Sequence, residues 1–142
     1  MKLGAYTACL HDRPLPQALD VLKSNGLASV EVNTGGFIPA PHCHVDLLLA
    51  SAQARGDYLD VFASRGMELT GLNCNGNPLS PLPGVGPKHA DDLRRTIELA
   101  GLLGVPRLAI RRGRNRPRCL LLGRVSRRAR RGQPGYRGQH RA

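Results

Sequence analysis

Residues 1–110 are predicted to form an α/β fold in which strands and helices alternate in the order β-α-β-α-β-α-β. Short apolar runs alternate with segments whose apolar residues recur every three or four positions, which is the period of an amphipathic helix. Glycine, alone or after asparagine, stands where each helical segment should end. Strands that alternate with helices pair in one parallel sheet, and the helices pack against it.

The first strand is expected at residues 2–8, directly after the initiator methionine. Pro14 and Pro16 then open a helix, because proline suits the first helical turn, and Asn25-Gly26 stops it. A second strand is expected at residues 28–33, followed by an irregular loop at residues 34–44.

Residues 45–65 have a helical composition, and Gly56 is expected to split them into two helices because glycine weakens a helix interior. A third strand is predicted at residues 67–73, then a loop rich in turn-forming residues at 74–87. The next helix, at residues 88–100, should bury its three- and four-spaced apolar positions, and Asp91 can pair with Arg95. Those positions are Ala90, Leu93, Ile97 and Ala100. A fourth strand begins at residue 105.

The loops that should follow the strands are long and polar, at residues 9–13, 34–44 and 74–87, whereas the opposite turns are short. In parallel sheets, functional residues lie in the loops at the C-terminal ends of the strands. A (β/α) barrel and a doubly wound sheet share this asymmetry, so the loops alone leave both architectures open.

The net charge of +11 is located almost wholly at one end of the chain. All ten Asp and Glu residues precede residue 111, together with nine of the 21 Lys and Arg residues. The remaining twelve basic residues are all Arg and lie within residues 111–142. The chain therefore divides into a domain at residues 1–110 and a basic, low-complexity tail at residues 111–142.

Two interpretations of the Arg-rich tail follow from its composition. A disordered basic arm would bind RNA or DNA non-specifically with a strong salt dependence. Alternatively, a GC-rich gene read out of frame turns Ala and Gly codons into Arg, Pro and Gly codons. We favour the out-of-frame interpretation, because the composition changes abruptly inside a strand, where no domain boundary should fall.

No apolar run approaches the ~18 residues that a membrane span needs, and no signal peptide is visible. We therefore expect a cytoplasmic protein without membrane contact. Cys9, Cys43, Cys74 and Cys119 are widely spaced, and we expect free thiols.

Polar side chains at the predicted strand ends are the candidate site residues. We expect His11, on the first loop, and Glu31, near the end of the second strand, to be catalytic. Asn33, Asn73, Asn75 and His89 are the candidate substrate-binding residues, since amides suit the hydroxyl groups of a polyol. Each has a plainer interpretation: a salt bridge for Glu31, turn capping for the asparagines and solvated loop positions for the histidines.

Two motifs carry weaker predictions. The His-x-His of residues 42–44 lacks the three or four converging ligands of a zinc site. Gly84-Val85-Gly86 precedes a helix but matches neither a P-loop nor a dinucleotide fingerprint, and Asp91 and Asp92 would repel a phosphate there.

Two segments, Asn73-Cys74-Asn75-Gly76-Asn77-Pro78 and residues 89–100 (HADDLRRTIELA), resemble the sugar phosphate isomerase/epimerase family. The start of the chain and the strand that carries Glu31 agree with this resemblance. The family has the xylose isomerase-like TIM barrel and is related to one class of apurinic endonuclease. The resemblance implies the N-terminal half of a (β/α)8 TIM barrel at residues 1–110, followed by the disordered Arg-rich tail.

Full-length members of that family interconvert keto sugars or sugar phosphates and use a divalent metal such as Mn, Co, Mg or Zn. Most metal ligands come from the second half of the barrel, and a complete barrel needs roughly 250 residues. Beyond Glu98 this chain has no acidic residue, so we expect it to hold no metal and to be inactive alone. The open edges of such a half barrel should favour self-association.

Overall fold

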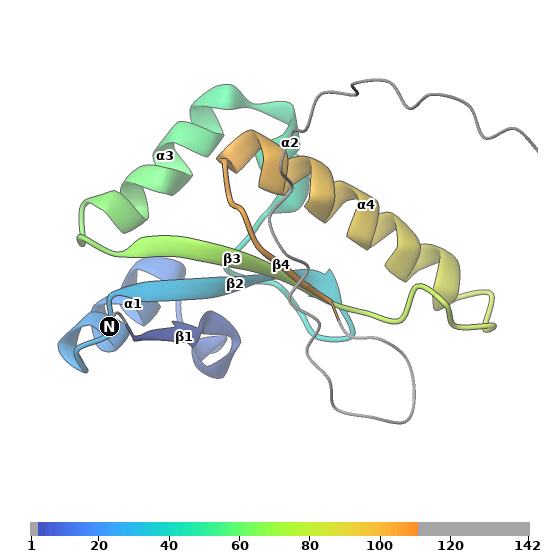
Figure 1. The fold of residues 1–142 in the computed structure, drawn as a ribbon, viewed down its shortest axis with the longest axis horizontal. Coiled ribbons are helices and arrows are strands. Elements are labelled where there is room, and N and C mark those ends of the chain that lie inside the picture. The colour runs from blue at the N-terminus through green and yellow to red at the C-terminus, as the bar shows by residue number, and fades with distance from the viewer. Residues whose placement is uncertain (1–2, 111–142) are drawn as a thin grey trace, which may run out of the picture.

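The computed structural model describes residues 3–110 and has the predicted α/β character (Figure 1). A short 3-10 helix, Thr7–Leu10, follows the first strand. The strands are β1 (Gly4–Tyr6), β2 (Ser29–Gly36), β3 (Glu68–Asn75) and β4 (Leu108–Ile110). The helices are α1 (Leu15–Ser24), α2 (Val45–Ala50), α3 (Ala52–Ala63) and α4 (Gly86–Leu103). The predicted alternation of strands and helices is confirmed.

The four strands form one parallel sheet in the order β1-β2-β3-β4, so each strand lies beside its neighbour in the chain. The paired segment moves along the sheet from the first strand to the last. β1 starts opposite Ser29, whereas β4 starts opposite Leu72, which itself pairs with Val32. Because β2 pairs with both β1 and β3 from Ser29 onward, this advance of three residues along β2 occurs at the step from β3 to β4.

One face of the sheet carries the hydrophobic core. Val30 and Val32 of β2 and Leu72 of β3 are fully buried, and they belong to a single cluster with residues of all four helices. Its helical members are Leu15, Leu19, Leu22, Leu48, Phe62, Leu99, Ala100 and Leu103. Alternate side chains of a strand point to opposite faces, so Glu31 points away from this core. The fold is compatible with half of a barrel, in which helices cover the outer face alone.

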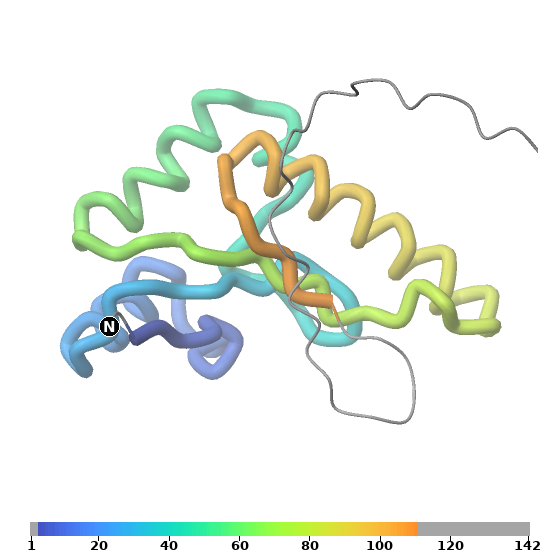
Figure 2. The backbone as a smooth tube through the Cα atoms, viewed as in Figure 1, coloured from blue at the N-terminus to red at the C-terminus, as the bar shows by residue number. Residues whose placement is uncertain are grey.

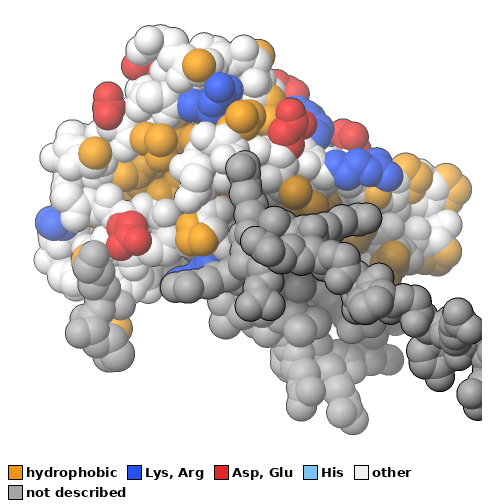
Figure 3. All heavy atoms as spheres, turned by 45° about the horizontal axis from the view of Figure 1, so that its top comes forward, with side chains coloured by type: hydrophobic (Ala, Val, Ile, Leu, Met, Phe, Trp, Pro, Cys, Tyr) orange, Lys and Arg blue, Asp and Glu red, His pale blue; other side chains and the backbone are white. Residues whose placement is uncertain are grey.

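The outer surface of the helical layer mixes charged and apolar side chains (Figure 3). Leu47 of α2 and Ile97 and Leu102 of α4 are among its exposed large apolar residues. No helix within residues 3–110 is long and apolar enough to cross a membrane.

The helix break predicted at Gly56 lies instead at Ser51. Gly56 is inside α3, while Ser51 is extended (φ −128°, ψ 120°) and separates α2 from α3. The Ser51 hydroxyl accepts a hydrogen bond from the Ala54 backbone N–H at 3.1 Å, which makes Ser51 the N-cap of α3. Capping by Ser51 therefore sets the boundary between α2 and α3, and α3 tolerates the destabilising effect of Gly56 in its interior.

The predicted buried face of α4 is rotated relative to the observed one. Ile97 is 56% exposed, whereas Thr96 is fully buried and His89 is 4% exposed. The predicted pair of Asp91 with Arg95 is also wrong, because the Arg95 guanidinium forms an ion pair with Asp46 of α2. Both differences arise because α4 packs against β2 and α2, so tertiary partners override the local pattern.

Two strands are longer than predicted. β2 continues to Gly36 and β3 to Asn75, two or three residues into the expected loops. Gly35 and Gly36 have positive φ values of 154° and 100°, which let β2 continue beside β3 through an irregular register. Beyond β3, the connection to α4 extends past the end of the sheet (Figure 2).

Candidate functional site

The face of the sheet opposite the core carries a line of polar side chains. Glu31 and Asn33 alternate with Val30 and Val32 along β2, and Asn73 pairs with Asn33 on the neighbouring strand. The Asn73 side-chain amide donates a hydrogen bond to Glu31 Oε1 at 2.6 Å. The structure thus brings together two predicted site residues, a carboxylate and an amide.

We predicted that Glu31 lies near the end of its strand, and this prediction is wrong. It is the third of eight residues of β2, because the strand continues to Gly36. Its side chain is therefore within the sheet face, below the loops that follow the strands.

Tyr6 of β1 pairs directly with Glu31 of β2. Burial, with a smaller contribution from the negative charge of Glu31, raises the pKa of the Tyr6 phenol to about 12. The Tyr6 hydroxyl is buried and has no hydrogen-bond partner among the described residues. Tyr6 therefore stays protonated at neutral pH and has a hydrogen-bond donor still to be satisfied.

A cavity of about 340 Å³ opens on this polar face, next to Glu31. Its lining is Gly4, Ala5, Tyr6, Ser29, Val30, Glu31, Thr70 and Arg107. Gly71 lies between the acid and the base, since a Cβ there would make ordinary contacts of 3.5 Å with Glu31 Oε2 and 3.7 Å with Arg107 Cβ. A carboxylate, a phenol and a guanidinium around one cavity can bind hydroxyl groups and an anionic group of a small polar molecule.

Asn33 holds the loop that follows its own strand. Its side-chain amide donates to the carbonyl oxygens of Ile38 at 3.2 Å and Pro39 at 3.0 Å. The residue is 3% exposed, and its Oδ1 has no hydrogen-bond partner among the described residues. Asn33 therefore positions the β2–α2 loop, and only its oxygen can still accept a hydrogen bond.

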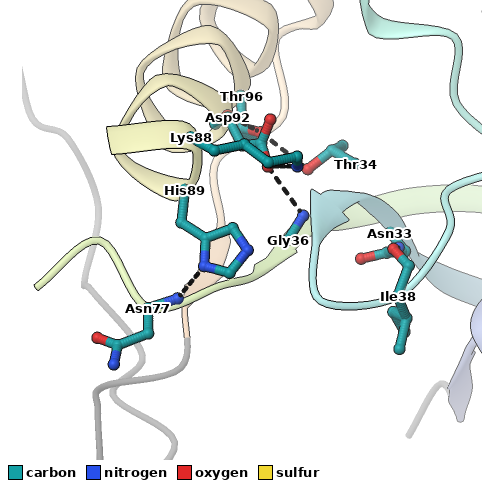
Figure 4. A network of polar contacts seen from close by, with 9 residues as sticks. All are labelled: Asn33, Thr34, Gly36, Ile38, Asn77, Lys88, His89, Asp92 and Thr96. Carbon is teal, nitrogen blue, oxygen red and sulfur yellow. Dashed lines mark hydrogen bonds and ion pairs between the residues drawn. The ribbon is translucent and has the colours of Figure 1, made fainter. Parts of the chain in front are cut away.

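His89 lies in the first turn of α4 and holds the β3–α4 loop (Figure 4). Its Nδ1 accepts a hydrogen bond from the Asn77 backbone N–H at 2.9 Å, so the neutral ring carries its proton on Nε2. The ring packs edge-on against Phe37, with the ring centroids 4.4 Å apart. A Cβ on Gly76 would approach His89 Cγ to 2.9 Å, so the loop fits closely around the ring.

Asp92 joins the end of β2 to α4, a role that the sequence analysis missed (Figure 4). Its Oδ2 accepts from the Gly36 backbone N–H at 3.2 Å and from Lys88 Nζ at 2.7 Å. Close by, the hydroxyls of Thr34 and Thr96 are 2.8 Å apart. The Lys88–Asp92 spacing of four residues was a visible signal of the ion pair, but nothing in the sequence indicated the contact with Gly36.

The remaining predicted site residues, His11 and Asn75, form hydrogen bonds with residues other than Glu31 and Asn73. His11 is exposed, and its Nδ1 bonds the carbonyl of Ala8, in the preceding 3-10 helix, at 3.0 Å. Asn75 ends β3, and its backbone carbonyl accepts from the Phe37 N–H at 2.8 Å. The structure therefore joins Glu31 and Asn73 directly, and it assigns His89 and Asn33 to loop positioning.

The His-x-His motif is split between two environments. His42 is 3% exposed, and its Nε2 bonds the Arg13 carbonyl at 2.8 Å, whereas His44 is exposed just before α2. Both line a mainly apolar cavity of about 420 Å³ on the helical side. Within residues 3–110, no three His, Cys, Asp or Glu side chains converge as a metal site would require.

The three described cysteines are free, as predicted: Cys9 is exposed, and Cys43 and Cys74 are buried. Cys119 lies outside the described residues. Burial raises the pKa of the Cys43 thiol to about 11, against a smaller lowering by the Tyr58 hydroxyl. Cys43 is therefore a neutral thiol, poorly suited to act as a nucleophile.

No family model matches the sequence. The chain is similar to an uncharacterised protein, YfiH, of Bacillus subtilis (strain 168), with 40% identity over 113 residues. The match covers 80% of this chain but 36% of that protein, so the chain spans about a third of the length of the curated relative it matches.

Proposed function

We propose that residues 1–110 are the N-terminal half of a barrel of the sugar phosphate isomerase/epimerase type, with a substrate-facing wall around Glu31. The sheet geometry is the observation that carries this proposal. Its strands are all parallel and follow chain order, and one core joins all the helices to one face. A doubly wound sheet places helices on both faces and reverses its strand order, which this sheet does not do.

The advance of the paired segments supports a barrel more specifically. A (β/α)8 barrel has eight strands and a shear of 8, which is one residue per strand on average. Here the paired segment advances three residues over the three steps from β1 to β4. This total is compatible with the stagger of half a barrel.

The chemistry of the open face fits a small polyol or its phosphate. Asn73 orients the Glu31 carboxylate, which can accept hydrogen bonds from two sugar hydroxyls. Arg107 lines the same cavity and supplies a positive charge suited to a phosphate group. The resemblance in residues 73–78 and 89–100 adds the reaction class, interconversion of keto sugars or their phosphates.

The divalent metal of this enzyme class does not fit the described residues alone. Among the described residues, Glu31 is the only acidic one that lines the open cavity, and the Asp92 carboxylate is bonded to Gly36 and Lys88 instead. Further ligands would have to come from outside residues 3–110, so the chain's own contribution is to orient and bind the substrate. On this proposal the chain alone has no epimerase activity.

Complementation tests this proposal. The full chain is co-expressed with the part of the Bacillus subtilis relative that it does not match, and keto sugar epimerisation is assayed with Mn²⁺, Co²⁺, Mg²⁺ or Zn²⁺. We expect activity that needs both parts and that falls at least tenfold in Glu31→Gln, while Glu98→Gln, at an exposed position of α4, leaves it unchanged. Activity on abasic DNA in place of sugars would favour the apurinic endonuclease alternative, and failure of every combination would contradict the proposal.

A second candidate function rests on the charge distribution alone. Twelve Arg and no acidic residues lie within residues 111–142, which are outside the described residues. Nucleic-acid binding through this segment predicts an affinity that falls steeply with salt and is lost when residues 111–142 are deleted. A shallow salt dependence that the deletion leaves unchanged would rule it out.

A further inference from the structure

We propose that two copies of this chain close one eight-stranded parallel barrel, with β4 of each copy paired to β1 of the other. The proposal rests on the half-barrel architecture argued above and names the partner of its two open edges as a second copy. The edges are β1 and β4, which within residues 3–110 have one strand neighbour each.

Symmetry makes a second copy geometrically suitable. A twofold axis along the barrel axis leaves the strand direction unchanged, so both new junctions are parallel, like the three junctions inside each copy. Four strands from each copy give the eight of a complete (β/α)8 barrel. Closure also removes both edges, which otherwise present unpaired backbone groups.

The stagger of the sheet fixes the register of the new junction. β1 starts at the level of Ser29 and β4 at the level of Val32. A shear of 8 shared equally by two copies is four residues per copy, which places the first residue of the next strand four residues beyond Ser29, at the level of Asn33. Asn33 pairs with Asn73, and Asn73 pairs with Ala109. Gly4 of the second copy would then lie opposite Ala109, and Ala5 of the second copy opposite Ile110.

The backbone of β4 is oriented for this pairing. The Leu72 N–H donates to the Arg107 carbonyl at 3.0 Å, so Arg107 faces β3. Along a strand, successive residues direct their N–H and C=O groups to opposite sides, so Ala109 also faces β3. Leu108 and Ile110 therefore direct their N–H and C=O groups to the open edge, where a second copy can satisfy them.

Closure would enclose the polar face. Each copy contributes one Glu31 carboxylate and one Arg107 guanidinium to the lining, so the described residues of the lining carry acids and bases in equal number. A polar interior of this kind has hydrogen-bonding groups for water or a small polar ligand, rather than an apolar surface that must be filled.

The oligomeric state of the full chain tests the proposal directly. Sedimentation velocity of the 142-residue protein over a concentration series should give a dimer. Ile110→Pro removes an edge N–H and should give a monomer, whereas Ile110→Thr keeps the N–H and should remain dimeric. Circular dichroism verifies that both variants are folded. A monomer at every concentration, or a dimer that Ile110→Pro does not weaken, would overturn the proposal.

A cross-link provides a second measurement if Ile110→Pro fails to fold. In a background with Cys9→Ser, Cys74→Ala and Cys119→Ser, which also removes the thiol that pairs with position 110 inside one copy, the double variant Ala5→Cys/Ile110→Cys should form a disulfide-linked dimer on oxidation, while either single variant should not. Absence of this cross-link in a dimer would exclude the proposed register. A monomer that still complements the Bacillus subtilis segment would overturn the dimer alone, and a dimer without complementation would contradict only the proposed function.

Discussion

The side-chain amide of Asn73 and the carboxylate of Glu31 are joined by a 2.6 Å hydrogen bond across the junction of β3 and β2. The two residues are 42 positions apart in the sequence, so only the parallel pairing of the strands brings them together. The bond satisfies one carboxylate oxygen and leaves the other beside Gly71, near Arg107. Glu31 is therefore held in one orientation on the open face of the sheet.

This bond predicts energetic coupling between the two residues. Asn73→Ala should lower the free energy of unfolding by about 1–2 kcal/mol, since a hydrogen bond to a charged group is lost. In a Glu31→Ala background, Asn73→Ala should lower the free energy of unfolding much less. Urea denaturation of the wild type, the two single variants and the double variant measures the difference. Asn75→Ala, on the same strand but without a side-chain hydrogen bond to another described residue, is the control and should shift stability by less than about 0.5 kcal/mol. Additive effects of the two alanines would show that the bond contributes nothing.

Two glycines should respond to alanine in opposite directions. Gly36 has φ 100°, and a Cβ there would lie 2.3 Å from the backbone carbonyl of Asn75, so Gly36→Ala should cost about 2–4 kcal/mol. Gly56 is inside α3 with no atom within 4 Å of a new Cβ, so Gly56→Ala should stabilise by about 0.5–1 kcal/mol. Thermal unfolding of the two variants measures both signs. A stabilising Gly36→Ala would contradict the observed course of β2.

Stability should fall in alkali because of a buried thiol. Burial raises the pKa of Cys43 from 9.0 to about 11, so the folded protein keeps a proton that the unfolded chain loses. The protonated Cys43 thiol makes its full contribution to the free energy of unfolding below about pH 9. This contribution is lost as the pH rises toward 11, which lowers the free energy of unfolding by about 2 kcal/mol in total. Urea denaturation between pH 8 and pH 11 under reducing conditions measures it. Cys43→Ala should fall less steeply over this range, and an equal slope in both proteins would exclude Cys43 as the cause.

Most of the element order followed from hydrophobic periodicity, because helices and strands with one buried face show it locally. Residues whose environment depends on distant partners were harder to predict. Ile97 continued an apolar repeat yet is exposed, while Thr96 is buried beside Thr34 of β2. The pairing of Glu31 with Asn73 required the register of the sheet, which no local pattern specifies.

The last prediction concerns the gene. If residues 111–142 are read out of frame, translating the other two frames beyond the codon for Ile110 should restore family-like sequence in one of them. That sequence should complete the fourth strand and alternate strands with helices for roughly another 140 residues, as a full barrel requires. Acidic and His residues should reappear at strand ends, and the Arg excess should return to the near-neutral balance of residues 1–110. This chain matches 36% of its Bacillus subtilis relative, so the restored sequence can be aligned with the remainder of that protein. Early stop codons in both frames, or an Arg-, Pro- and Gly-rich sequence without periodicity, would refute the out-of-frame interpretation. Residues 111–142 would then have to be treated as a basic segment that the gene encodes.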